Sequence, residues 1–128
     1  MPSNYGEGKV PLPAIEHPTV IFIINHTWKH NSVSEDAVYN ATRHAWKIGK
    51  DARDRATYAL GVAHGVVRGA YRIDRWKQVG ERWEFEGVPA PELDAIDKSG
   101  ARLKPAQGQA SAVRYYLGGI PAPNAERG

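Results

Sequence analysis

The chain has 128 residues, a formal net charge of +3 and no cysteine. This length fits one domain, and the lack of cysteine excludes disulfides, thiolate metal ligands and a cysteine nucleophile. From residue 29 to residue 82 there are eleven Lys and Arg against six Asp and Glu, whereas from residue 83 onward there are five against six. Positive charge therefore gathers in the middle of the chain, which favours an anionic partner.

The first residues are polar and rich in Gly and Pro, without the charged start and apolar centre of a signal peptide. We expect residues 1–18 to form a flexible arm, residues 19–117 a single domain and residues 118–128 a flexible tail. The longest apolar run, residues 20–24, is too short to span a bilayer. Together with the lack of cysteine, these features predict a cytoplasmic protein that does not cross a membrane.

Residues 19–25 are β-branched and almost continuously apolar, which is typical of a buried strand. A helix is predicted over residues 34–47, because Ser32 and Glu35 have the spacing of a capping box and acidic residues fill the first turn. Small side chains recur along one side of this helix and are expected to face a sheet. They are Ala37, Ala41, Ala45 and Ile48.

The charged segment 50–55 is predicted to be an exposed connection. Two strands follow, over residues 57–64 and 65–73, joined at a glycine-bearing bend. Side chains alternate between the two faces of a strand, so Arg68 and Arg72 are expected to leave the same side.

Charged and aromatic residues alternate over residues 82–87, which predicts a strand with one wet and one buried face. A short helix is expected over residues 92–98 and a last strand over residues 113–117. This order of elements predicts an α+β fold, built as a small curved sheet or pseudo-barrel with one main helix and a short second helix.

The sequence gives little support for catalysis. A metal-assisted hydrolase that uses His26, His30 and His64 stays as an alternative, although the glutamate of the metalloprotease motif is missing. The chain has no Gly-x-Ser-x-Gly elbow, no phosphate loop and no pair of acids suited to acid–base work. We therefore predict a binding module with no catalytic residues and no cofactor.

Aromatic and cationic side chains are interleaved in the basic middle of the chain. The set comprises Trp28, Trp46, Trp76, Trp83, Arg43, Arg68, Arg72, Arg75 and Arg82. Flat rings stack on bases, and guanidinium groups pair with phosphate. An ordinary alternative stays open, in which Trp83 and Phe85 belong to the core and the arginines lie on a solvated strand face.

Several short motifs resemble the PUA-like modules that include EVE and ASCH domains. They are Tyr39-x-x-x-Arg43-x-x-Trp46, Tyr58-Ala-Leu-Gly-Val, Gly65-Val-Val-Arg68, Arg75-Trp76 and Arg82-Trp83-x-Phe85-x-Gly87. The likeness covers residues 20–87 and extends to segments that accompany some GIY-YIG-type nucleases of bacteria and phages. It implies a pseudo-barrel whose concave side holds nucleic acid, with a flipped or modified base among aromatic side chains. The chain lacks the tryptophan-rich start of EVE domains and the nuclease signature, so cleavage is not implied.

The predicted function is therefore the binding of nucleic acid or a nucleotide by a monomer. The predicted site consists of Asn25, Trp28, Tyr39, Arg43, Trp46, Arg68 and Arg72. We expect the helix face with Arg43 and Trp46 to form a cleft with the strand that carries Arg68 and Arg72. Asn25 could read a base edge or close a turn. The alternative class is a phage or defence-associated module that binds a partner protein or sequesters a signalling nucleotide.

Overall fold

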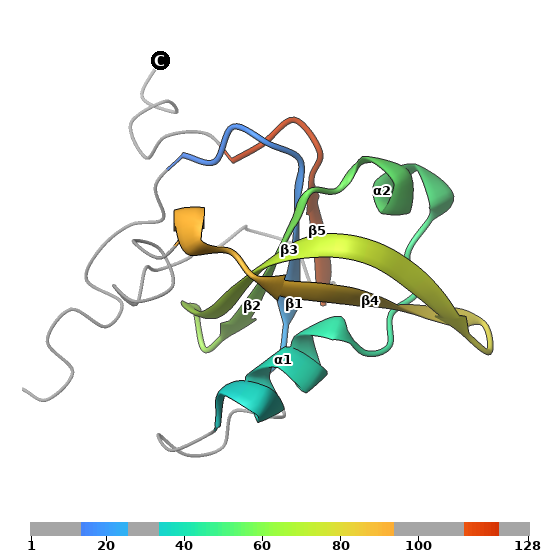
Figure 1. The fold of residues 1–128 in the computed structure, drawn as a ribbon, viewed down its shortest axis with the longest axis horizontal. Coiled ribbons are helices and arrows are strands. Elements are labelled where there is room, and N and C mark those ends of the chain that lie inside the picture. Colours follow the sequence, from blue (N-terminus) through green and yellow to red (C-terminus); the bar gives the residue numbers. More distant parts are fainter. Residues whose placement is uncertain (1–13, 26–33, 94–111, 121–128) are drawn as a thin grey trace, which may run out of the picture.

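The computed structural model describes residues 14–25, 34–93 and 112–120, which form a five-stranded mixed sheet in the order β4-β3-β2-β1-β5 (Figure 1). The elements are β1 Thr19–Ile23, α1 Glu35–Arg43, α2 Lys50–Arg55, β2 Tyr58–Ala63, β3 Val66–Val79, β4 Arg82–Pro89, a 3-10 helix Pro91–Leu93 and β5 Val113–Tyr116. β1 and β2 are parallel, and the other neighbours are antiparallel. The α+β class is confirmed. In the described ranges the sheet is open at β4 and β5 and does not close into a barrel.

Both helices lie in the crossover between the parallel strands β1 and β2 and cover the same face of the sheet. Val38 of α1 and Ala52 of α2 pack in one core cluster with Val20 and Phe22 of β1. We call this side the helix face. On the other side, which we call the opposite face, alternate residues such as Ile21 belong to a second core cluster.

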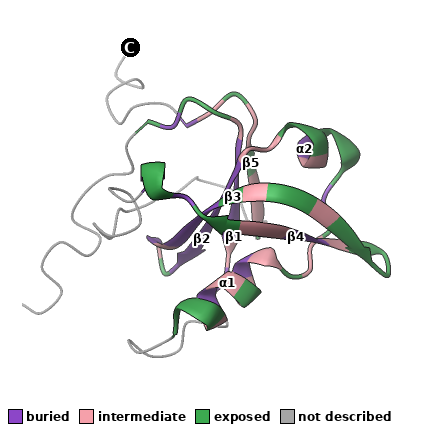
Figure 2. Ribbon diagram, viewed as in Figure 1, coloured by how far each residue is buried: buried purple, intermediate pink, exposed green. Residues whose placement is uncertain are grey.

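The central strands account for most of the buried residues. All six residues of β2 are buried, as are four of the five in β1. In Figure 2 the far end of the β3–β4 hairpin is mostly exposed, and Figure 1 shows this hairpin curving beyond the rest of the sheet. The hairpin therefore offers surface that the central strands do not.

Helix α1 begins where the sequence predicts but ends earlier. Its N-cap is Ser34, whose hydroxyl oxygen accepts a hydrogen bond from the Ala37 amide at 3.1 Å. It ends at Arg43, because the following chain is extended and pairs with β4 through Trp46. The prediction that the helix continues to Lys47 is therefore wrong.

The buried side of α1 also differs from the predicted stripe of small residues. Val38 and Thr42 are its buried residues, whereas Ala37 is only partly buried. A side chain on Gly61 of β2 would drive its Cβ into the Thr42 hydroxyl oxygen. Glycine at position 61 thus allows the helix to approach the sheet closely.

Residues 50–55 form helix α2, so the prediction of an exposed connection is wrong. Two ion pairs at i,i+4 spacing stabilise this helix: Lys50 with Asp54 at 2.6 Å, and Arg55 with Asp51 at 3.1 Å. Ala52 adds burial against the helix-face core.

The ends of the later elements also differ from their predicted bounds. β3 continues to Val79, well beyond the predicted end at residue 73, with a register shift between Ile73 and Arg75. The expected short helix over residues 92–98 appears as the 3-10 turn at Pro91–Leu93, and residues 94–98 lie outside the described ranges.

Candidate nucleic-acid interface

The structure does not bring the predicted site residues into one cleft. Arg43 and Trp46 lie where α1 meets β4, and Trp46 packs against the helix-face core. Arg72 pairs in register with Tyr58, which belongs to the opposite-face core, so the sheet separates Arg72 from Arg43. The predicted cleft between the helix and the arginines of β3 is therefore wrong.

The remaining predicted site residues lie apart from each other. Arg68 is the extra residue of a β-bulge in β3, and its Nε donates to the Ala63 carbonyl at 3.3 Å. The Asn25 side-chain oxygen accepts a hydrogen bond from the His64 amide at 2.8 Å, so Asn25 closes the turn between β2 and β3. Trp28 lies outside the described residues.

The outer edge of β4 is covered by the chain that ends α1. The backbones of Trp46 and Trp83 exchange two hydrogen bonds, at 2.7 and 2.8 Å. Two residues further along the same edge, Arg43 Nε donates to the Phe85 carbonyl at 2.9 Å. Each bond satisfies a polar group that an edge strand would otherwise expose.

Tyr39 covers the same edge of β4 at Gly87, two residues beyond Phe85. Its hydroxyl donates to the Gly87 carbonyl at 3.1 Å and accepts from the Gly87 amide at 3.0 Å. Tyr39, Arg43 and Trp46 were predicted to bind a ligand from one helix face. In the structure their hydrogen bonds hold the edge strand β4 instead.

The ring of Trp46 is also engaged inside the molecule. It stacks on Phe22 with 4.9 Å between ring centroids and 26° between the planes. Its indole nitrogen donates to the Thr42 carbonyl at 2.8 Å. These contacts are those of a residue that packs against the core.

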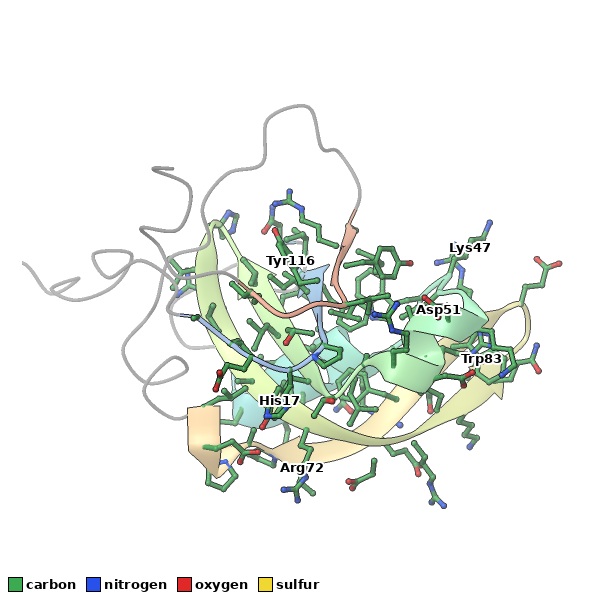
Figure 3. All side chains as sticks on the ribbon, turned by 90° about the horizontal axis from the view of Figure 1, so that it is seen from above. His17, Lys47, Asp51, Arg72, Trp83 and Tyr116 are labelled. Atoms are coloured by element: carbon green, nitrogen blue, oxygen red, sulfur yellow. The ribbon has the colours of Figure 1, made fainter. Side chains whose placement is uncertain are left out.

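A different group of aromatic and cationic side chains gathers at the far end of the β3–β4 hairpin, beside α2. We call it the Trp83 surface; it consists of Lys47, Arg53, Trp76 and Trp83. In Figure 3, Lys47 and Trp83 lie together with Asp51 on one side of the view, well away from His17, Arg72 and Tyr116. Asp51, which lies beside this group, is paired with Arg55.

The centre of the Trp83 surface is a stacked pair of side chains. The guanidinium carbon of Arg53 lies 3.8 Å from the centroid of the Trp83 ring. Arg53 is fixed from the other side, because its Nη1 donates to the Ile48 carbonyl at 2.6 Å. Trp83 is partly exposed while its backbone is held by Trp46.

On the other face of β4 from Trp83, the carboxylate of Glu84 binds two basic residues. Its Oε2 accepts from Arg43 Nη2 at 2.9 Å, and its Oε1 lies 2.6 Å from His44 Nδ1. The hydrogen bond with His44 and the charge of Arg43 hold the pKa of Glu84 below its ordinary value, although burial opposes them. Glu84 is buried, so the prediction that this side of the strand is wet is wrong at this position.

Sequence reasoning missed Arg53 as a residue of the Trp83 surface. Arg53 was placed in an exposed connection, and nothing local in the sequence shows that α2 lies against β4. Arg82 leaves β4 on the face opposite to Trp83, and its Nη1 approaches the Ala45 carbonyl at 3.4 Å. These contacts join residues about thirty or more positions apart, so no short-range pattern in the sequence predicts them.

Comparisons with protein-family models, with curated proteins and with solved structures return no match for this chain. Within the described ranges, no group of three or more His, Asp or Glu side chains is placed to hold a metal ion. Two histidines of the metal alternative, His26 and His30, lie outside those ranges. None of the helices in the described parts of the chain is long and apolar enough to cross a membrane.

Proposed function

We propose that the protein is a binding module for single-stranded nucleic acid and that the Trp83 surface is its contact surface. The observation that carries the proposal is the guanidinium of Arg53 held over the partly exposed ring of Trp83. Bases stack on aromatic rings and on guanidinium planes, and neighbouring cations pair with phosphate. A single strand fits best, because its bases are free to leave their own stack.

The proposal keeps the ligand class that the PUA-like resemblance implies and moves the contact from the helix–β3 cleft to the hairpin end. The cations of this surface are Lys47 and Arg53, and the acid that lies beside them in Figure 3, Asp51, is paired with Arg55. Such a surface attracts a polyanion with little demand on base sequence. A cytoplasmic binding module without catalytic residues stays consistent with the sequence.

The proposal is tested by titrating the protein with a single-stranded oligonucleotide of about 12 nucleotides, a length that spans a stacking platform of this kind. We expect quenching of tryptophan fluorescence on binding. The affinity should fall roughly ten- to a thousandfold between about 50 and 200 mM salt, because bound counterions are released. A response that does not depend on salt would contradict phosphate contacts.

Variants of α2 locate the binding surface. Arg53→Gln should weaken binding by roughly five- to a hundredfold, the loss expected when a stacking group is removed. Arg55→Gln is the matched control, because it removes the same charge from the same helix at a residue that pairs with Asp51. Equal losses for the two variants would show a non-specific charge effect, and no loss for Arg53→Gln would place binding elsewhere.

A further inference from the structure

The guanidinium of Arg53 is held flat against the ring of Trp83. Its carbon atom Cζ lies 3.8 Å from the ring centroid, and at this distance a tilted group would press one of its nitrogens into the ring. The orientation within that plane is also fixed, because Nη1 donates to the Ile48 carbonyl at 2.6 Å. A flat ligand that binds the edge of this guanidinium would therefore lie in the layer that stacks on Trp83.

Most of the donors of this partly exposed guanidinium are unused. Arginine has five N–H donors and no acceptor, and in the described parts of the chain Arg53 makes only the hydrogen bond from Nη1. Its Nε and Nη2 thus keep two parallel donors, a fork that matches two adjacent acceptors on a flat ligand. Lys47 of the same surface also only donates, and the acid beside it, Asp51, is paired with Arg55. The surface therefore favours a base edge that consists of acceptors alone.

We propose that Arg53 and Trp83 form a binding site for one guanine base. Guanine presents two neighbouring acceptors, O6 and N7, whereas adenine places a donor beside N7 and thymine has no two adjacent acceptors. Unpaired cytosine also has two, but its single ring covers less of Trp83 than a purine does. The phosphate contacts read no sequence, so the preference concerns one base position. That this guanine belongs to a single strand rests on the proposed function, and a free guanine nucleotide offers the same edge.

The first experiment uses labelled single strands of about 12 thymidines in which one central base is varied, and measures their affinities by fluorescence anisotropy. A strand with one guanine should bind roughly five- to tenfold more tightly than the all-thymine strand, the low end of what a bidentate arginine contact contributes. Replacing this guanine by 7-deazaguanine keeps the stacking area but removes the N7 acceptor, and should abolish most of the gain. Equal binding of the guanine and 7-deazaguanine strands, or tighter binding of a strand with one cytosine, would overturn the inference.

Two lysine variants of α2 test whether Arg53 provides the preference. Arg53→Lys keeps the positive charge but loses the planar fork, so the affinity ratio of the guanine strand to the all-thymine strand should fall to about one. Arg55→Lys is the matched control, because it makes the same change on the same helix at a residue paired with Asp51, and it should keep the ratio. A uniform loss of binding or stability does not alter this ratio, since both strands are measured on the same protein. A ratio that Arg53→Lys leaves unchanged would overturn the role of Arg53.

Free nucleotides separate this inference from the proposed function. Guanosine and adenosine monophosphate are added while the indole N–H signal of Trp83 is followed by NMR, and we expect the guanine nucleotide to shift this signal at the lower concentration. Strand binding with no preference among bases or free nucleotides would overturn the guanine site and leave the proposed function standing. A preference for the free guanine nucleotide without strand binding would overturn the proposed function and assign the site to a free nucleotide. The absence of both responses would overturn both.

Discussion

The Glu84 network gives the sharpest test of the structure, through the substitution Glu84→Gln. Glutamine keeps the shape of the side chain but leaves Arg43 without an opposite charge, in a pair whose side chains are only 18% and 11% exposed. Removing one partner of a partly buried charged hydrogen bond costs about 1–3 kcal/mol. A loss near 2 kcal/mol would lower the melting temperature by roughly 6–12 °C in a domain of this size.

The pH dependence of this loss has a defined sign. The pKa of Glu84 is lowered in the folded protein from its ordinary value of 4.5. Its contribution to the free energy of unfolding is therefore present above that value and is lost as the pH falls through the lower folded pKa. The stability difference between wild type and Glu84→Gln should be largest near neutral pH and should shrink below about pH 4.

The assay is urea unfolding at a series of pH values, with Glu86→Gln as the control. Glu86 lies on the same strand and pairs with Arg75, but these side chains are 35% and 77% exposed. We expect Glu86→Gln to cost about 0.5 kcal/mol or less. Equal costs for the two substitutions, or a Glu84→Gln difference that stays constant to low pH, would refute the assigned network.

Three further substitutions test the packing of α1 and the edge of β4. Tyr39→Phe removes both hydrogen bonds to the Gly87 backbone and should cost about 1–2 kcal/mol of unfolding free energy in urea; no change would mean that water replaces the hydroxyl. Gly61→Ala drives a methyl group toward the Thr42 hydroxyl and should cost about 1–3 kcal/mol, with a smaller cost in a Thr42→Ala background; purely additive costs would contradict the contact. Trp46→Ala should cost about 3 kcal/mol in thermal unfolding, and a fully stable variant would return Trp46 to the candidates for ligand stacking.

The strands were largely predictable because each has a local signature. The β-branched run at residues 19–25 contains β1, and the alternating segment 82–87 lies within β4. The predicted strand over residues 113–117 contains β5. Burial of the central strands and alternation in the outer ones are short-range properties, so the sequence carries them directly.

The helices were predicted less well, for two different reasons. The end of α1 depends on the pairing of Trp46 with Trp83, a contact between distant parts of the chain that replaces further helical turns. The formation of α2 had a signal that was not used, since Lys50 and Asp54 stand at the spacing of a helical ion pair. Charge alone was taken as a sign of a loop, although charges at this spacing also favour a helix.

The candidate site shows the same division. Residue type correctly drew attention to Tyr39, Arg43 and Trp46, but their hydrogen bonds are directed at the edge of β4. The position of Arg72 depends on strand register, because its partner Tyr58 faces the side of the sheet away from the helices. Strand register and edge contacts depend on the whole fold. The composition therefore indicated which types of side chain matter but not where they lie in the structure.

The residues that cover the edge of β4 also prepare the surface beside it. Trp46 fixes the backbone of Trp83, and the Ile48 carbonyl fixes the guanidinium of Arg53 over the Trp83 ring. Side chains that are already held in one arrangement lose less conformational freedom when a ligand binds. The side chains of this surface are already ordered by folding, so a nucleic-acid strand that stacks on them would lose little further conformational entropy of the protein. The structural role of the residues that follow from α1 is therefore linked to the proposed binding role of α2 and β4.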